Sequence, residues 1–144
     1  MDSIDVEGAT GNVHTNYDGK AAATIDAFKN GVELVYVHVE GPDECGHRAE
    51  IDNKVKSIEL IDQKILFPVY EYLKSCGEPF KIMILPDHPT PIRIRTHSID
   101  PVPFMIYSSE KDEKGTATFD EFSAKATNYY VPNGYTLMGE LVEK

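Results

Sequence analysis

The sequence predicts an α/β fold in which a mostly parallel sheet is flanked by helices. Apolar, β-branched runs alternate along the chain with segments whose apolar residues recur every three or four positions. This strand–helix–strand rhythm favours right-handed crossovers and parallel strands. The chain has 144 residues, of which 41% are hydrophobic and 26% are charged. This composition is ordinary for a soluble protein, so residues 1–144 are expected to form a single domain with a core.

The first part of the chain is expected to be a loop, a helix and a strand. Glycines among threonines and asparagines predict a polar loop over Gly8–Gly19. The Ala-rich segment Lys20–Lys29 has helical spacing and is closed by Asn30-Gly31, a favourable helix end. Leu34–Val39 is a continuous apolar run, typical of a strand that is covered on both faces.

A long amphipathic helix is predicted from about His47 to Leu73. Its apolar residues recur at helical spacing between charged ones, and this stripe is expected to be core. Pro68 is expected to kink or split the helix, because proline lacks the amide hydrogen that the helix needs. Cys76-Gly77 closes the segment.

The remaining part of the chain should supply two more strands and two short helices. The strands are expected at Lys81–Leu85, stopped by Pro86, and at Val102–Tyr107. The charged segment around Gly115 predicts a mobile loop, and the helices follow at about Phe119–Ala126 and Tyr135–Glu143.

Charge and cysteine content exclude several classes of function. The net charge of −10 argues against nucleic acid and anionic membranes as partners, because no basic field would attract phosphates. No apolar stretch approaches the ~20 residues of a membrane span, and the first residues do not resemble a signal peptide. Cys45 and Cys76 are too few for a disulfide scaffold and are expected to be free thiols. A cytoplasmic location is therefore expected.

Acidic and imidazole side chains gather at predicted strand ends, where open α/β sheets bind ligands. Asp43 follows the first strand, and one helical turn would bring His47 beside it. Asp87 and His88 follow the second strand, and His97 precedes the third. Carboxylate and imidazole ligands suit divalent ions such as Mn²⁺ or Zn²⁺. Such ions can hold a phosphoryl group between them.

Each short motif also has a structural explanation. Asp and His near a helix start can be capping residues, and an Asp-His pair after a strand can be turn chemistry. The metal interpretation is favoured because the fragments fall at equivalent ends of successive strands. His38, inside an apolar strand, is expected to be a hydrogen-bonded core residue, and His14 is left undecided.

Positive and polar side chains near these ligands are candidates for substrate binding. Arg93 and Arg95 alternate beside His97 and could bind phosphate or carboxylate, or could equally be solvated residues. Asn16 could line the pocket together with Asn12 and Thr15, although a polar turn would use the same residues.

Taken together, the motifs resemble the cofactor-independent phosphoglycerate mutases of the alkaline phosphatase superfamily, and the archaeal-type branch most closely. They are Asp43-Glu44-Cys45-Gly46-His47, Asp87-His88-Pro89-Thr90-Pro91, Arg95-Thr96-His97, Asp100-Pro101-Val102-Pro103-Phe104 and the loop from Gly8 to Tyr17. The similarity extends over nearly the whole chain, including Lys54–Asp62. Members of this branch are sometimes labelled homoserine kinase.

The resemblance implies a partial alkaline phosphatase-like core with two divalent ions, Mn²⁺ first and Zn²⁺, Mg²⁺ or Co²⁺ as alternatives. Asp43, His47 and His97 would hold one ion, and Asp87 and His88 the other. In the family, a serine carries the phosphate between 3-phosphoglycerate and 2-phosphoglycerate. That serine, and an aspartate of the second metal site, come from an N-terminal half that this sequence lacks, so no catalytic nucleophile is assigned here.

The expected function is therefore that of the C-terminal, metal-binding part of a mutase of glycolysis and gluconeogenesis. Alone, the chain should bind one ion well and the other poorly, without turnover. Two alternatives stay open. One is another phosphotransferase or phosphohydrolase of the superfamily, such as a phosphopentomutase or a protein labelled homoserine kinase. The other is a non-catalytic metal-binding fragment. An exposed sheet edge would also favour self-association.

Overall fold

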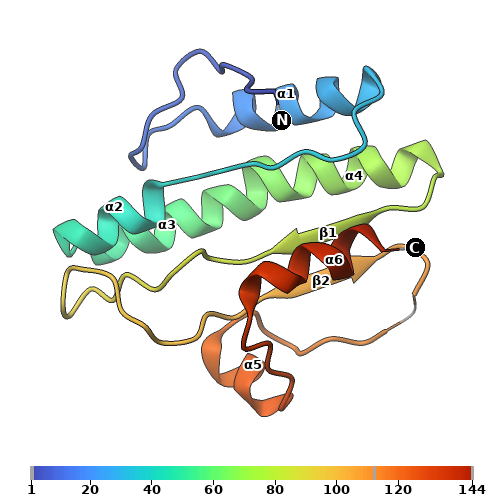
Figure 1. Cartoon of the computed structure of the whole chain (residues 1–144). Helices are drawn as coiled ribbons and strands as arrows, with labels where there is room; N and C mark the ends of the chain where they lie inside the picture. Colours follow the sequence, from blue (N-terminus) through green and yellow to red (C-terminus); the bar gives the residue numbers. More distant parts are fainter. Residues whose placement is uncertain (1, 112, 144) are drawn as a thin grey trace. The chain divides into compact units, whose positions relative to one another are not determined.

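The computed structural model describes residues 2–111 and 113–143. The chain forms two compact units, and Figure 1 labels the helices and strands of both. The first unit contains the chain up to Gly77 together with Thr90–Ser98, and the second contains Glu78–Pro89 and the chain from Ile99 onward. None of the helices in the described ranges combines the length and the apolar character needed to cross a membrane.

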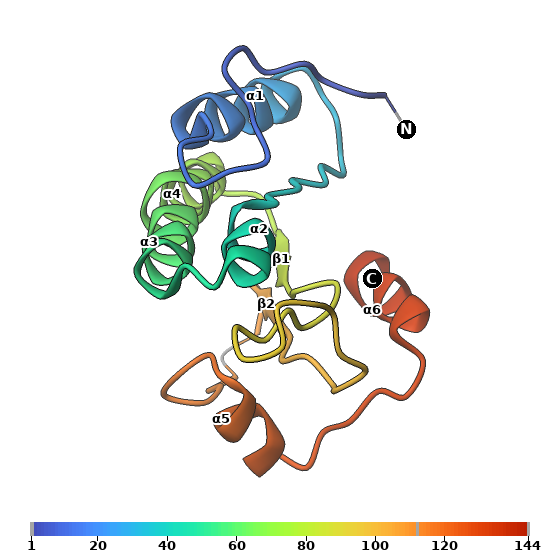
Figure 2. The same cartoon turned by 90° about the vertical axis from the view of Figure 1, so that its left-hand side faces the viewer.

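The first unit is helical. Helix α1 (Tyr17–Lys29) begins three residues earlier than the sequence predicts. The reason is the cap residue Asn16, whose side-chain oxygen accepts a hydrogen bond from the backbone of Gly19 at 2.8 Å. Helix α2 (Gly41–Arg48) follows, and then α3 (Ile51–Ile61), the π-helical segment η1 (Asp62–Leu66) and α4 (Phe67–Cys76). Figure 2 shows α2 beside α3, and α1 beside α4.

The predicted long helix differs from the observed structure in two ways, a break at Ala49 and the π-helical segment η1. Ala49 adopts a left-handed conformation with φ of 58°, which separates α2 from α3. Two hydrogen bonds close this helix end, from Ala49 N to Gly46 O at 3.2 Å and from Glu50 N to Cys45 O at 2.9 Å. Pro68 lies in the first turn of α4, and the helical segment changes from α to π just before it, with η1 ending at Leu66. A proline ring clashes with the carbonyl four residues earlier, and a wider π turn moves that carbonyl away.

The core of the first unit is small. Among its buried side chains are Tyr17 from α1, Cys45 from α2 and Ile65 from η1. The Tyr17 hydroxyl lies 2.9 Å from the hydroxyl of Ser57, which is completely buried, and this hydrogen bond ties α1 to α3.

The prediction that the whole apolar stripe of the long helix is core is wrong for its first half. Ile51, Val55 and Ile58 are 61%, 52% and 53% exposed. Helix α3 instead turns Ser57 and Lys54 toward the rest of the first unit, where both make hydrogen bonds. Amphipathic spacing identifies which residues share a face of a helix, but not which neighbour covers that face.

The second unit contains the two strands that the structure describes. Strand β1 (Lys81–Ile84) pairs antiparallel with β2 (Met105–Ser108), with Lys81 opposite Ser108 and Ile84 opposite Met105. Helices α5 (Glu121–Ala126) and α6 (Leu137–Val142), with the 3-10 turn η2 (Gly134–Thr136), complete the unit. The Lys81 ammonium donates to the carbonyl oxygens of Glu140 and Glu143 at 3.0 and 2.6 Å, which links β1 to α6.

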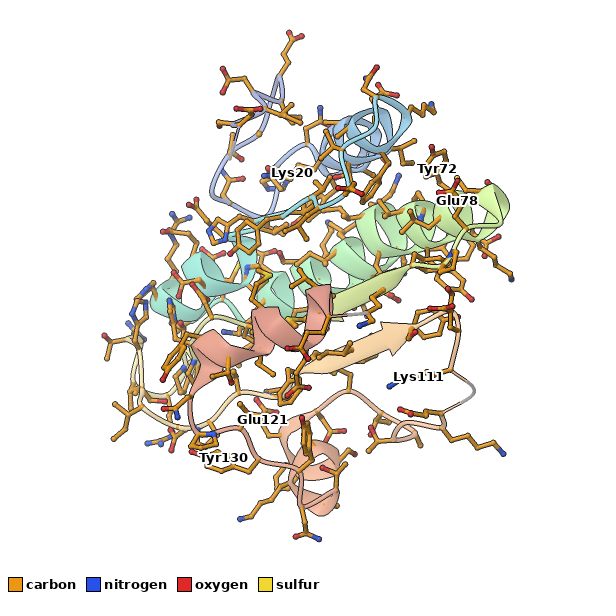
Figure 3. The ribbon with its side chains drawn as sticks, turned by 45° about the vertical axis from the view of Figure 1, so that its right-hand side comes forward. Lys20, Tyr72, Glu78, Lys111, Glu121 and Tyr130 are labelled. Atoms are coloured by element: carbon orange, nitrogen blue, oxygen red, sulfur yellow. The ribbon has the colours of Figure 1, made fainter. Side chains whose placement is uncertain are left out.

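The described strands therefore do not confirm the prediction of a mostly parallel sheet, because the pair that they form is antiparallel. The predicted strand at 34–39 has no strand pairing among the described residues, although its burial alternates, with the three valines half-buried and Leu34, Tyr36 and His38 exposed. His38 is not a core residue, and its Nε2 atom lies 3.7 Å from Glu40 Oε1. Lys20, labelled in Figure 3, donates to the His38 carbonyl at 2.9 Å and fastens this segment to α1. An apolar run shows that a segment suits a sheet, but a ladder also needs a partner edge.

Candidate metal centre

Helix α2 brings the first two predicted ligands together. Asp43 lies in its first turn and His47 in its last, so their four-residue spacing places both side chains on one face. The His47 Nε2 atom lies 3.3 Å from Asp43 Oδ2. The prediction that these two side chains share a helical turn is confirmed, although α2 is a separate helix and not the start of the long one.

Cys45 lies between these residues in sequence and takes no part in the cluster. It is only 2% exposed. Burial raises the pKa of its thiol above the ordinary value, and the nearby Glu50 carboxylate raises it further. The enclosed Cys45 thiol is not among the side chains that converge on the candidate metal centre.

His97 reaches the same point from the segment Thr90–Ser98. A turn closes within that segment, where Arg95 N donates to Pro91 O at 3.0 Å. Arg95 itself has φ of 55°, the left-handed region that side chains other than glycine rarely adopt. This turn presents the Arg95 carbonyl to His47, and its oxygen lies 3.0 Å from His47 Nδ1.

The contact with the Arg95 carbonyl decides which nitrogen of His47 is available. A carbonyl oxygen can only accept, so Nδ1 carries the hydrogen and donates it. In the neutral ring Nε2 then holds an unshared pair, and it is Nε2 that points toward Asp43 and His97. A backbone carbonyl that orients an imidazole in this way is a common second partner of metal-binding histidines.

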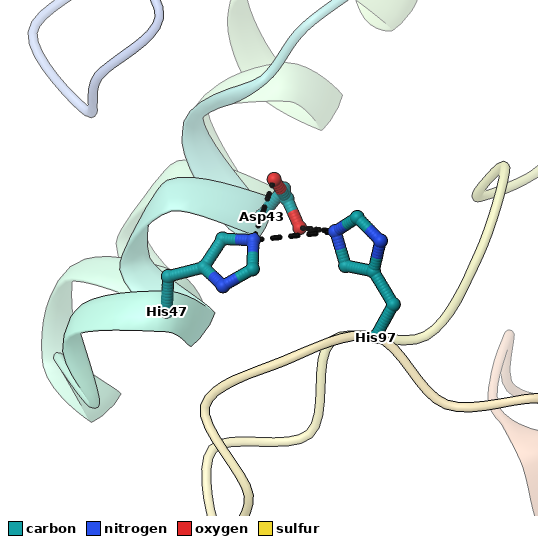
Figure 4. Close-up of side chains that lie close together, drawn as sticks. All are labelled: Asp43, His47 and His97. Atoms are coloured by element: carbon teal, nitrogen blue, oxygen red, sulfur yellow. Dashed lines mark hydrogen bonds and ion pairs between the residues drawn. The ribbon is translucent and has the colours of Figure 1, made fainter.

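The three side chains converge, as Figure 4 shows. His47 Nε2 and His97 Nε2 are 3.2 Å apart, and His97 Nε2 lies 3.4 Å from Asp43 Oδ1. One ligand atom from each residue lies within 4.8 Å of the others. Around a tetrahedral Zn²⁺ with bonds of about 2.0–2.1 Å, neighbouring ligand atoms are about 3.3 Å apart. The donor set and its spacing therefore fit a divalent cation.

The cluster is also accessible. The side chains of Asp43, His47 and His97 are 33%, 35% and 50% exposed. A cation held by these three side chains would keep coordination positions open toward solvent, as catalytic metal sites do and closed structural sites do not.

Asp87 and His88 belong to the second unit and follow β1. His88 Nε2 lies 3.4 Å from Asp87 Oδ2, and the His88 backbone donates to Asp87 Oδ1 at 3.1 Å. Within the described residues of that unit the pair meets no third ligand of the same kind. That Asp87 and His88 hold a second ion, and hold it poorly in this chain alone, stays a prediction.

The predicted substrate residues have different surroundings. Arg93 and Arg95 are both exposed. Both polar atoms of the Asn16 side-chain amide make hydrogen bonds. The oxygen caps α1, and the nitrogen donates to Glu7 O at 2.8 Å. These contacts favour the polar-turn explanation for Asn16.

Sequence reasoning missed two residues that support the cluster. Thr90 donates from its hydroxyl to Asp43 Oδ1, and Lys54 donates to the Thr90 carbonyl at 2.9 Å. Both residues also lie against Gly46 of α2, where an added Cβ atom would meet them. The only available signal was the place of Thr90 between Pro89 and Pro91, directly after Asp87-His88.

Comparisons with known proteins show which proteins the chain is similar to. The chain is 49% identical to the 2,3-bisphosphoglycerate-independent phosphoglycerate mutase of Methanosarcina barkeri, over 99% of this chain and 36% of that protein. It is 45% identical to the enzyme of the same name from Methanothrix thermoacetophila, over 96% of this chain and 35% of that one. The chain thus spans about a third of the length of these curated relatives.

The chain is also similar to a solved structure. The PH0037 protein of Pyrococcus horikoshii superposes with a TM-score of 0.76 at 31% identity, over 87% of this chain and 37% of that one. The model of the metalloenzyme superfamily matches residues 1–129. The chain belongs to the metalloenzyme superfamily, and within it resembles archaeal cofactor-independent phosphoglycerate mutases.

Proposed function

We propose that this chain is the metal-binding segment of a 2,3-bisphosphoglycerate-independent phosphoglycerate mutase, which interconverts 3-phosphoglycerate and 2-phosphoglycerate. The observation that carries the proposal is the convergence of Asp43, His47 and His97 on one point. The names of the relatives supply the reaction, and the similarity covers nearly all of this chain.

Asp43, His47 and His97 would hold one divalent cation. Such an ion lowers the pKa of a bound hydroxyl and neutralises charge on the oxygens of a transferring phosphoryl group. Asp43 contributes the anionic ligand, and the Arg95 carbonyl keeps His47 in the tautomer that offers Nε2. The acceptor serine would come from outside this chain.

Asp87 and His88 would contribute to a second ion, completed by a ligand from outside this chain. Mn²⁺ is our first choice for both ions, because the family resemblance implies it and carboxylate ligands suit it. Zn²⁺, Mg²⁺ and Co²⁺ are the alternatives. That Arg93, Arg95 and Asn16 contact the phosphoglycerate stays a prediction.

The surroundings of the protein follow from the same proposal. A glycolytic enzyme acts in the cytoplasm, and neither nucleic acid nor membrane is an expected partner of this acidic chain. The exposed Leu34 and Tyr36, 44% and 63% accessible, lie on the segment that the sequence predicts to be a strand. We infer that this segment joins a larger, mostly parallel sheet when covered, and that it favours self-association when it is not.

Thermal melting tests the metal part of the proposal. A metal present at a hundred times its dissociation constant should stabilise the chain by about 2.7 kcal/mol. We expect this shift with Mn²⁺ or Zn²⁺ for the unmodified chain, and its loss for His97→Ala. His14→Ala is the matched control, because His14 is also exposed but lies outside the cluster. No shift with either metal, or an equal shift for His97→Ala, would contradict the proposal.

A chimera tests the reaction. The matching segment of the Methanosarcina barkeri mutase would be replaced by this chain, and formation of 2-phosphoglycerate would be followed by a coupled assay. We expect turnover that is lost in His97→Ala, and none from the isolated chain with Mn²⁺. A folded chimera that hydrolyses phosphate esters without forming 2-phosphoglycerate would favour the phosphohydrolase alternative. Enzyme-like rates from the isolated chain would contradict the need for an external serine.

A further inference from the structure

Thr90 is one of few buried polar residues in the first unit, with 5% of its surface exposed. A buried hydroxyl needs a hydrogen-bond partner, because leaving it without one costs free energy. Its partner is Asp43, a member of the candidate metal centre, through the oxygen Oδ1. The proline that follows Thr90 also restricts its backbone to extended conformations.

The main chain of Thr90 is held as firmly as its side chain. Lys54 from α3 donates to the Thr90 carbonyl at 2.9 Å. Helix α2 approaches closely at Gly46, where a Cβ atom would lie 2.6 Å from the same carbonyl oxygen. Contacts with α2 and α3 therefore hold the Thr90 main chain independently of the hydrogen bond between its hydroxyl and Asp43.

The hydrogen bond from Thr90 reaches one of the two carboxylate oxygens of Asp43. The terminal torsion of an aspartate has a broad, shallow preference, so its two oxygens are not placed by the rotamer alone. In this structure Oδ1 receives the Thr90 hydroxyl and lies 3.4 Å from His97, while Oδ2 lies 3.3 Å from His47. A fixed donor at Oδ1 keeps both distances in place together.

We propose that Thr90 is a positioning residue of the metal centre, which sets the rotation of the Asp43 carboxylate, with Lys54 fixing Thr90 in turn. This inference rests on the proposed function, since it assumes that Asp43 binds a metal. Partners of this kind around ligating side chains typically change metal affinity by about 10- to 100-fold when they are removed.

Two substitutions of Thr90 separate the hydroxyl from the shape of the side chain. Thr90→Val keeps the shape and removes the hydroxyl, whereas Thr90→Ser keeps the hydroxyl. Thr24→Val is the matched control, because Thr24 is equally buried, at 5%, and its hydroxyl donates to Lys20 O in α1, away from Asp43. Mn²⁺ affinity would be measured from the six-line EPR signal of the free ion, using the 144-residue chain.

We expect Thr90→Val to weaken Mn²⁺ binding by about 10- to 100-fold, with Thr90→Ser and Thr24→Val near the unmodified value. The visible absorption of bound Co²⁺ is a second readout. Its bands should shift in Thr90→Val and be restored in Thr90→Ser, which a merely structural role would not produce. If Thr90→Val fails to fold, Lys54→Met takes its place, and weaker Mn²⁺ binding is again expected.

Two results would overturn the proposal. Unchanged Mn²⁺ affinity in folded Thr90→Val, or in Lys54→Met where that variant takes its place, would show that the hydroxyl does not position Asp43. An equal loss in Thr24→Val would show that any buried threonine has the same effect. Failure of the proposed function looks different, because the unmodified chain would then bind neither Mn²⁺ nor Co²⁺.

Discussion

Replacing Gly46 by alanine is a sensitive perturbation of the candidate metal centre. Gly46 lies inside α2, where alanine is normally preferred to glycine by about 0.5–1 kcal/mol. An added Cβ atom would lie 2.6 Å from the Thr90 carbonyl oxygen and 2.9 Å from both Lys54 Nζ and Thr90 Cγ2. The lysine end can move away, but the carbonyl belongs to the main chain and cannot move alone.

The magnitude follows from these two opposing effects. Overpacking of a close contact typically costs about 1–3 kcal/mol. After subtracting the helix preference of about 0.5–1 kcal/mol, we expect Gly46→Ala to lower the free energy of unfolding by about 0–2.5 kcal/mol. Displacement of Thr90 should also weaken Mn²⁺ binding by about tenfold, because the hydroxyl would leave Asp43.

Urea denaturation followed by far-ultraviolet circular dichroism measures the stability, and Mn²⁺ titration measures the affinity. The control is Gly139→Ala in α6, where the nearest atom to an added Cβ is Glu143 Oε1, 3.9 Å away. With open space, alanine there should raise stability by about 0.5–1 kcal/mol. If Gly46→Ala behaves like Gly139→Ala and binds Mn²⁺ normally, the close approach of Thr90 to α2 is not a constraint.

Three further predictions concern other parts of the first unit. Cys76 is exposed, whereas burial and the Glu50 carboxylate raise the pKa of the Cys45 thiol. A thiol reagent near pH 8 should therefore label Cys76 quickly and Cys45 only on unfolding. Equal labelling rates of the two thiols in the native chain would contradict this. Arg95→Gly should leave Mn²⁺ affinity and stability unchanged. The contact with His47 uses the backbone carbonyl of Arg95, and glycine readily adopts φ of 55°. Loss of Mn²⁺ binding would instead assign a role to the Arg95 guanidinium. Tyr17→Phe removes the hydroxyl that is hydrogen-bonded to the buried Ser57 hydroxyl, and it should lower the free energy of unfolding, measured by urea denaturation, by about 1–3 kcal/mol. The control Tyr135→Phe, at an 82% exposed residue, should change it little. Equal effects would argue against the Tyr17–Ser57 hydrogen bond.

Local patterns in the sequence determined much of this protein. The spacing of Asp43 and His47 was sufficient to place them together, because four residues make about one helical turn. The helix before Asn30 and the strand at Lys81 were also predictable, since their periodicity and end signals are local. The order of the acidic and histidine motifs indicated the family, which the match over residues 1–129 bears out.

Other features depended on contacts that no local pattern encodes. The antiparallel direction of the β1–β2 pairing depends on which strand edges come together. The segment 34–39 has no strand pairing among the described residues, so it is not a β-strand there. The exposure of Ile51 and Val55 likewise depends on what covers one face of α3.

The resemblance to a known family grouped His97 with Asp43 and His47, but no local pattern did, and their contact is a feature of the tertiary structure. That meeting requires a left-handed residue at Arg95, and neither this conformation nor the contact of its carbonyl with His47 has a sequence signature. It also requires Thr90 to be enclosed between α2 and α3. Sequence determines the chemical character of each ligand, whereas the distance between ligands far apart in the chain is fixed by the packing of the segments that carry them.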